Sequence, residues 1–118
     1  MGAVIQAYLR RNYVRLIERL LMGHGLVAIA THDQQILRYA LRFIAREGVP
    51  RERYEFEMLY GVRRDLQRAL ARRGEPVRTY VPFGREWYPY LVRRLAERPA
   101  NLMFVLTSLV REWRVSRL

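Results

Sequence analysis

The residues with the clearest chemical potential lie in the stretch 87–98, which reads WYPYLVRRLAER. It places aromatic side chains at 87, 88 and 90, ahead of the adjacent Arg93 and Arg94. On a helix, Tyr90 and Arg94 lie one turn apart on the same face, with Arg93 beside them. A guanidinium fork binds a carboxylate through two parallel hydrogen bonds, and an aromatic ring offers a flat apolar surface. The stretch therefore predicts a site for a small carboxylate attached to an apolar ring.

Arginine is so frequent in this chain that the pair needs further support. Other arginine pairs occur at 10–11, 63–64 and 72–73, and solvated helix faces carry such pairs without any function. All 22 basic residues are arginine, and the net charge is +11. Such a charge invites a nucleic-acid or acidic-membrane partner, but the arginines are spread over every predicted helix and no nucleic-acid motif accompanies them. We therefore favour solvated helix faces over nucleic-acid binding.

The size and composition of the chain predict one globular domain, 1–118. A chain of 118 residues can bury roughly two-thirds of its unfolded surface. The absence of cysteine excludes disulfides and thiolate chemistry. The longest apolar runs, such as 102–110, are too short to cross a bilayer, and no signal pattern opens the chain. We expect a cytoplasmic protein with no transmembrane segment, the alternative being peripheral contact with the inner membrane.

Hydrophobic patterning predicts strands and helices in alternation. The expected strands cover 3–9, 26–30, 54–60 and 77–81. The expected helices cover 12–22, 34–47, 65–73 and 87–98, and a last apolar helix is expected at about 101–113. Gly48 and Pro50 show the usual order of residues that ends a helix.

Four consecutive βα units imply an α/β fold with a parallel sheet, as in half of a (βα)8 barrel. An open, flavodoxin-like sheet is the alternative architecture. In either case the chemistry belongs at the C-terminal ends of the strands. The residues expected there are Thr31, His32, Asp33, Tyr60, Gly61 and the loop 82–87.

The other residues that could do chemistry form no recognisable site. His24 and His32 lack carboxylates at ligand spacing, so no metal site is predicted. A nucleophile elbow, a phosphate-binding glycine loop and paired carboxylates are all missing. Glu55 and Glu57 alternate onto one face of an expected strand, and we expect one of them to be buried against an arginine.

Three stretches strongly resemble the C-terminal part of bacterial proline dehydrogenases. They read VAIATHD (27–33), FEMLYGVRRDLQRAL (56–70) and VRTYVPFGREWYPYLVRRLAERPANL (77–102). YPYLVRRLAER is the most specific of the matches, and the resemblance covers nearly all of 2–113. The resemblance implies a barrel fold, an FAD cofactor and a role in proline catabolism. The reaction that it implies is the oxidation of L-proline to 1-pyrroline-5-carboxylate, after which a quinone reoxidises the flavin.

The resemblance also implies roles for individual residues. The substrate-binding positions of the family match Leu59, Tyr90, Arg93 and Arg94. The arginine pair would grip the carboxylate, the tyrosine would pack on the proline ring, and the leucine would line the pocket. Glu97 falls where the family places a carboxylate that orients the arginines. The positions that contact the flavin match Gln6, Thr31 and His32. The resemblance assigns no catalytic residue and no metal ligand.

The chain departs from the family pattern near its beginning. IQAYLRR (5–11) resembles the fourth barrel strand of the family, whereas NYVRLIERLL (12–21) resembles the helix after the fifth strand. This implies an internal deletion near Arg11–Asn12 in a truncated chain, of natural or engineered origin. The first three strands and the fifth, with their flavin and active-site groups, have no counterpart here.

These departures bear on activity and assembly. With flavin contacts missing, we expect weak or absent FAD binding and a colourless protein. Whether this chain is itself an enzyme stays open, and we expect the isolated fragment to be inactive. A non-catalytic scaffold with relic site residues is the competing interpretation. Because four parallel strands cannot close a barrel, we expect two copies to pair edge to edge as a homodimer.

Overall fold

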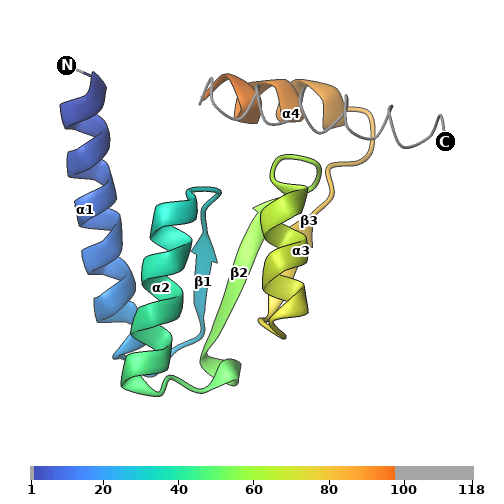
Figure 1. Cartoon of the computed structure of the whole chain (residues 1–118). Coiled ribbons are helices and arrows are strands. Elements are labelled where there is room, and N and C mark those ends of the chain that lie inside the picture. Colours follow the sequence, from blue (N-terminus) through green and yellow to red (C-terminus); the bar gives the residue numbers. More distant parts are fainter. Residues whose placement is uncertain (1, 98–118) are drawn as a thin grey trace, which may run out of the picture.

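The computed structural model of the chain describes residues 2–97 (Figure 1). Four helices and three strands follow one another, with a short 3-10 helix, η1 (Arg51–Arg53), ahead of the second strand. The main elements are α1 (Gly2–Leu21), β1 (Val27–Ala30), α2 (Gln34–Glu47), β2 (Tyr54–Leu59), α3 (Arg64–Arg72), β3 (Val77–Tyr80) and α4 (Trp87–Ala96). The helix expected at 101–113 lies outside the described residues.

The three strands form a parallel sheet in the order β1-β2-β3. Ile29 of β1 aligns with Phe56 of β2, which aligns in turn with Val77 of β3. α2 and α3 are the crossovers, and α4 lies across the end of the sheet at which the strands finish (Figure 1). The predicted α/β class and parallel sheet are confirmed. The prediction of four strands is wrong for the described part of the chain, where the sheet is open.

The missing strand is the stretch 3–9, which belongs to α1. Its large apolar side chains are at least half exposed, with Val4 73% and Tyr8 65% exposed. A strand must find a neighbour for its backbone N–H and C=O groups, whereas a helix satisfies them internally. With no strand beside it, this run continues the helix that follows, and α1 passes unbroken through Arg11 and Asn12. Gln6 therefore lies on a helix.

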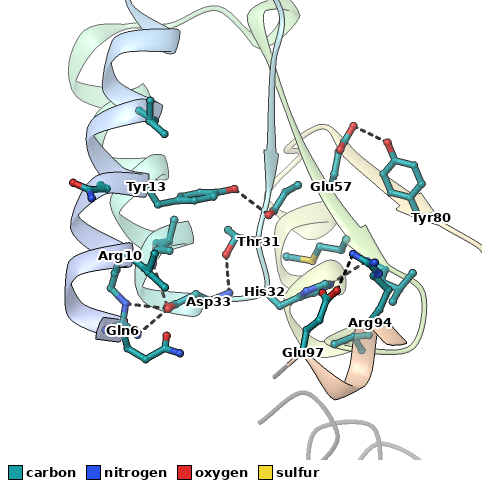
Figure 2. Close-up of a pocket in the computed structure, with 18 of the residues that line it drawn as sticks. Gln6, Arg10, Tyr13, Thr31, His32, Asp33, Glu57, Tyr80, Arg94 and Glu97 are labelled. Carbon is teal, nitrogen blue, oxygen red and sulfur yellow. Dashed lines mark hydrogen bonds and ion pairs between the residues drawn. The ribbon is translucent and has the colours of Figure 1, made fainter. Parts of the chain in front are cut away.

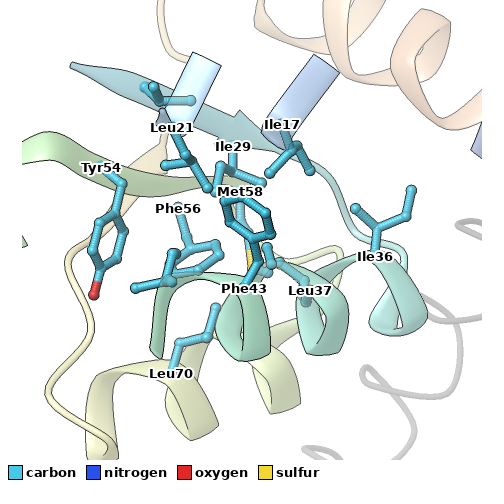
Figure 3. Close-up of a cluster of buried hydrophobic side chains, with 13 residues drawn as sticks. Ile17, Leu21, Ile29, Ile36, Leu37, Phe43, Tyr54, Phe56, Met58 and Leu70 are labelled. Atoms are coloured by element: carbon cyan, nitrogen blue, oxygen red, sulfur yellow. The ribbon is translucent and has the colours of Figure 1, made fainter. Parts of the chain in front are cut away.

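The core lies between one face of the sheet and the helices (Figure 3). On β2, Tyr54, Phe56 and Met58 are buried, since alternate residues of a strand share a face. Among the described helices, α2 contributes the most buried residues to the core, namely Ile36, Leu37, Ala40, Phe43 and Ile44. α1 contributes only Ile17 and Leu21, near its end.

The opposite face of the sheet carries Glu55, Glu57 and Leu59 of β2, which are half-buried. Both crossover helices thus pack on a single face, as in a (βα)8 barrel, whereas a doubly wound sheet has helices on both faces. None of the described helices is both long enough and apolar enough to traverse a bilayer.

Candidate functional site

A cavity of about 630 Å³ opens at the C-terminal ends of the strands. Its walls come from three parts of the molecule: the first four turns of α1, the ends of the three strands with the residues that follow β1, and α4. This is the edge of a parallel sheet at which ligands bind in α/β proteins. The volume lies within the usual range of ligand pockets, roughly 300–1,000 Å³.

The structure brings seven of the eight predicted site residues to this cavity. They are Gln6, Thr31, His32, Leu59, Tyr90, Arg94 and Glu97. Arg93 is exposed and does not line it. Successive helical residues are rotated by about 100°, and on α4 it is the side chain at 94, not at 93, that lines the cavity. The ligand roles of these residues stay predictions.

Arg94 is held in place by two neighbours on its own helix. Its Cζ atom lies 5.5 Å from the centre of the Tyr90 ring, within cation–π range. Its Nη1 atom lies 3.1 Å from Oε1 of Glu97, one turn further along the chain. A guanidinium carries five N–H donors, so this ion pair leaves donors for a carboxylate in the cavity. Figure 2 shows Arg94 and Glu97 beside the end of the sheet.

His32 joins the ends of β1 and β2. Its Nε2 atom accepts a hydrogen bond of 3.0 Å from the backbone N–H of Leu59. An imidazole nitrogen that accepts carries no proton, so the proton of neutral His32 is on Nδ1. The carbonyl of Leu59 accepts from Nε2 of Gln67 at 3.1 Å. Both backbone groups of Leu59 are therefore fixed, which positions its side chain in the cavity wall.

Thr31 and Asp33 shape the turn between β1 and α2. The buried Thr31 accepts a hydrogen bond of 3.1 Å at Oγ1 from the N–H of Asp33. Asp33 caps α2, because its Oδ1 accepts from the N–H groups of Gln35 at 2.9 Å and Ile36 at 3.4 Å. These bonds explain why α2 begins directly after the short turn that follows β1, at the wall of the cavity.

Arg10 of α1 completes this cluster, and no sequence pattern predicts its role. Its Nε and Nη2 atoms lie 3.0 and 2.8 Å from Oδ2 of Asp33, and Nη1 donates to Gln35 at 2.7 Å (Figure 2). Burial raises the pKa of Asp33, but the hydrogen bonds from Arg10, Gln35 and Ile36, with the charge of Arg10, lower it overall. The ion pair between Arg10 and Asp33 therefore links α1 to the start of α2.

Tyr13 attaches α1 to the edge of the sheet. Its hydroxyl donates a hydrogen bond of 2.9 Å to the carbonyl of Ala30, the last residue of β1 (Figure 2). Leu9 and Leu16 flank this contact along the cavity wall. α1 thus covers the edge of β1.

Two glutamates lie on the open face of β2 and have different partners. Glu55 receives both Nε and Nη2 of Arg78, at 2.8 and 2.9 Å, and the hydrogen bond from Arg78 is the main reason why its pKa is lowered. The expected contact between one glutamate and an arginine is confirmed, but Glu55 is half-buried and Arg78 is exposed. Glu57 instead lines the cavity and accepts from the Tyr80 hydroxyl at 3.2 Å, which raises the pKa of Tyr80.

Comparison with known proteins agrees with the resemblance seen in the sequence. The family model of proline dehydrogenase matches residues 6–107. A proline dehydrogenase of Deinococcus radiodurans is 44% identical over 101 residues, which are 86% of this chain and 33% of that protein. Proline dehydrogenase 1 and proline dehydrogenase 2 of Bacillus subtilis are 40% and 37% identical over the same shares. The chain spans about a third of the length of these curated relatives. It belongs to the proline dehydrogenase family.

Proposed function

We propose that this chain carries the carboxylate-binding part of a proline dehydrogenase site and binds L-proline in the cavity at the strand ends. The observation that carries the proposal is the position of Arg94, which faces this cavity while Tyr90 and Glu97 hold it. Arg94 would receive the carboxylate, and Tyr90 and Leu59 would contact the apolar ring. Arg93 would add only long-range attraction, because it does not line the cavity.

The residues expected to contact a flavin do not form a binding set on their own. Oγ1 of Thr31 and Nε2 of His32 each accept a backbone N–H, and Gln6 lies exposed on α1 rather than on a strand. We therefore propose weak or absent FAD binding and a colourless purified protein. When bound, FAD would accept the hydride from proline, the chemistry that the resemblance implies.

We propose the full reaction only for the longer members of the family. Oxidation of L-proline, with a quinone as the final acceptor, needs a held flavin beside the substrate. We propose that this chain binds the substrate without turning it over. The internal hydrogen bonds of Thr31 and His32 also favour the competing proposal, a scaffold whose site residues are relics.

A calorimetric titration with L-proline separates these two proposals. Hydrogen bonds to charged groups contribute about 1.5–3 kcal/mol, so Arg94→Met is expected to weaken binding by roughly 10- to 100-fold. Arg93→Met is the matched control and is expected to stay within about threefold of the unsubstituted chain, since Arg93 is exposed outside the cavity. A chain that does not bind L-proline, or an Arg94 variant that binds it normally, would favour the scaffold.

We also propose that two copies of the chain pair through a sheet edge. α1 covers the edge of β1, whereas β3 forms the other edge, where Arg78, Thr79 and Tyr80 are exposed. Unpaired backbone groups on such an edge favour pairing with another strand. Size-exclusion chromatography with light scattering is expected to show a dimer that Thr79→Pro weakens. A monomer at all concentrations would contradict this assembly.

A further inference from the structure

We propose that Glu57 binds the ammonium group of the substrate, so that the cavity recognises an amino-acid zwitterion and not a carboxylate alone. The inference rests on the proposed function and names the substrate class of the same site. Glu57 lines the cavity from β2, where Figure 2 shows its carboxylate directed to the Tyr80 hydroxyl, and Arg94 lines it from α4. One cavity therefore offers an anionic group and a cationic group to a ligand.

Of the two glutamates on the open face of β2, Glu57 is the one to which no described arginine donates a hydrogen bond. Arg78 engages both carboxylate oxygens of Glu55, which does not line the cavity. Among the described residues, Glu57 accepts a hydrogen bond from the neutral hydroxyl of Tyr80 at Oε1, and its carboxylate also interacts with that of Glu55. A carboxylate offers about four acceptor positions, so one hydroxyl leaves room for the N–H donors of a secondary ammonium. The Tyr80 contact also limits how Glu57 can rotate.

The charge of proline suits this arrangement. At neutral pH its amine is protonated and its carboxylate is ionised, so it carries one charge of each sign at adjacent positions of the ring. Arg94 would face the carboxylate and Glu57 the ammonium. A ligand without the nitrogen leaves the carboxylate of Glu57 facing apolar atoms, which is unfavourable. Selectivity for the zwitterion follows from that difference.

The test compares two ligands that differ only in the nitrogen. The full 118-residue chain is titrated with L-proline and with cyclopentanecarboxylate. The unsubstituted chain is expected to bind L-proline about tenfold more tightly. Glu57→Gln is expected to remove this preference by weakening only L-proline binding. Glu86→Gln is the matched control, because it makes the same change at an exposed position outside the cavity, and it is expected to keep the preference.

The outcomes separate the inference from the proposed function. Equal affinity of the unsubstituted chain for both ligands would overturn the role of Glu57 without any variant. If Glu57→Gln lowers the affinity for both ligands to the same degree, the role of Glu57 is also overturned, since a general structural role predicts that result. If Arg94→Met weakens both ligands while Glu57→Gln spares both, the proposed function stands and this inference falls. If Arg94→Met spares both ligands, the proposed function falls. If the unsubstituted chain binds neither ligand, both the inference and the proposed function fall.

Discussion

The guanidinium carbon of Arg94 lies 5.5 Å from the centre of the Tyr90 ring, one helical turn earlier on α4. Glu97 holds the same guanidinium from the other side, through an ion pair of 3.1 Å. The three side chains share one helix and one cavity. A preorganised cation of this kind can bind a carboxylate without first ordering a long side chain, which lowers the entropic cost of binding.

Glu97→Gln tests whether Glu97 orients Arg94. Both side chains are about half exposed, so losing the ion pair is expected to change the free energy of unfolding by less than about 1 kcal/mol. Affinity for L-proline is expected to fall a few-fold, since Arg94 becomes less ordered. Calorimetry and thermal unfolding measure the two effects, with the exposed Glu86→Gln as control. Equal affinities in the two variants would show that Glu97 does not orient Arg94.

Asp33→Asn tests the link between α1 and α2 and its dependence on pH. The pKa of Asp33 is lower in the folded chain than its ordinary value of 3.8, so ionised Asp33 stabilises the fold above that value. This stabilisation is lost as the pH falls through the folded pKa. Asparagine keeps the helix cap but not the charge facing Arg10. We expect the variant to be less stable at pH 7, by under about 1 kcal/mol.

The same prediction can be contradicted by the pH profile. Urea unfolding of both chains is measured from neutral pH to below pH 4. The difference in the free energy of unfolding is expected to shrink as Asp33 takes up its proton. A difference that stays constant across this range would show that the charge of Asp33 contributes nothing to stability.

His32→Ala tests whether His32 stabilises the ends of the strands. The substitution leaves the N–H of Leu59 without its acceptor and is expected to cost about 1–3 kcal/mol of unfolding free energy. The exposed His24→Ala is the matched control and is expected to change stability by less than about 0.5 kcal/mol. Chemical unfolding and hydrogen exchange at the Leu59 amide provide the readouts. Similar stabilities for the two variants would refute the structural role of His32.

Much of the fold could be predicted because its signals are local. α2 begins and ends at the expected residues, Gln34 and Glu47. Asp33 caps its start, and Gly48 closes it with a φ of 64°, a left-handed conformation that favours glycine. Alternating burial along β2 likewise matches its sequence pattern.

The stretch 3–9 could not be predicted in the same way. A short apolar run fits a buried strand or one side of a helix equally well, and the choice depends on whether another strand lies beside it. That neighbour is a property of the whole fold. The contact of Arg10 with Asp33, 23 residues away, was hidden for the same reason, since it exists only when residue 10 lies on a helix.

The candidate site shows the same division. The spacing of Tyr90 and Arg94 along one helix was sufficient to group them, whereas Glu97 was grouped with them only through the family resemblance. Local spacing could not decide whether Arg93 or Arg94 enters the cavity, because that depends on how α4 lies across the sheet. The position of Glu57 beside Tyr80 depends on the register of two strands, which pairs Leu59 with Tyr80.

The most direct test of the central claim is a titration of the ¹⁵N-labelled chain with L-proline, followed by backbone amide NMR. Binding in the cavity at the strand ends predicts progressive shifts at the amides of Leu59, Tyr90 and Arg94, and these shifts should disappear in Arg94→Met. Shifts confined to other parts of the chain, or no shifts up to the solubility limit of L-proline, would contradict the account.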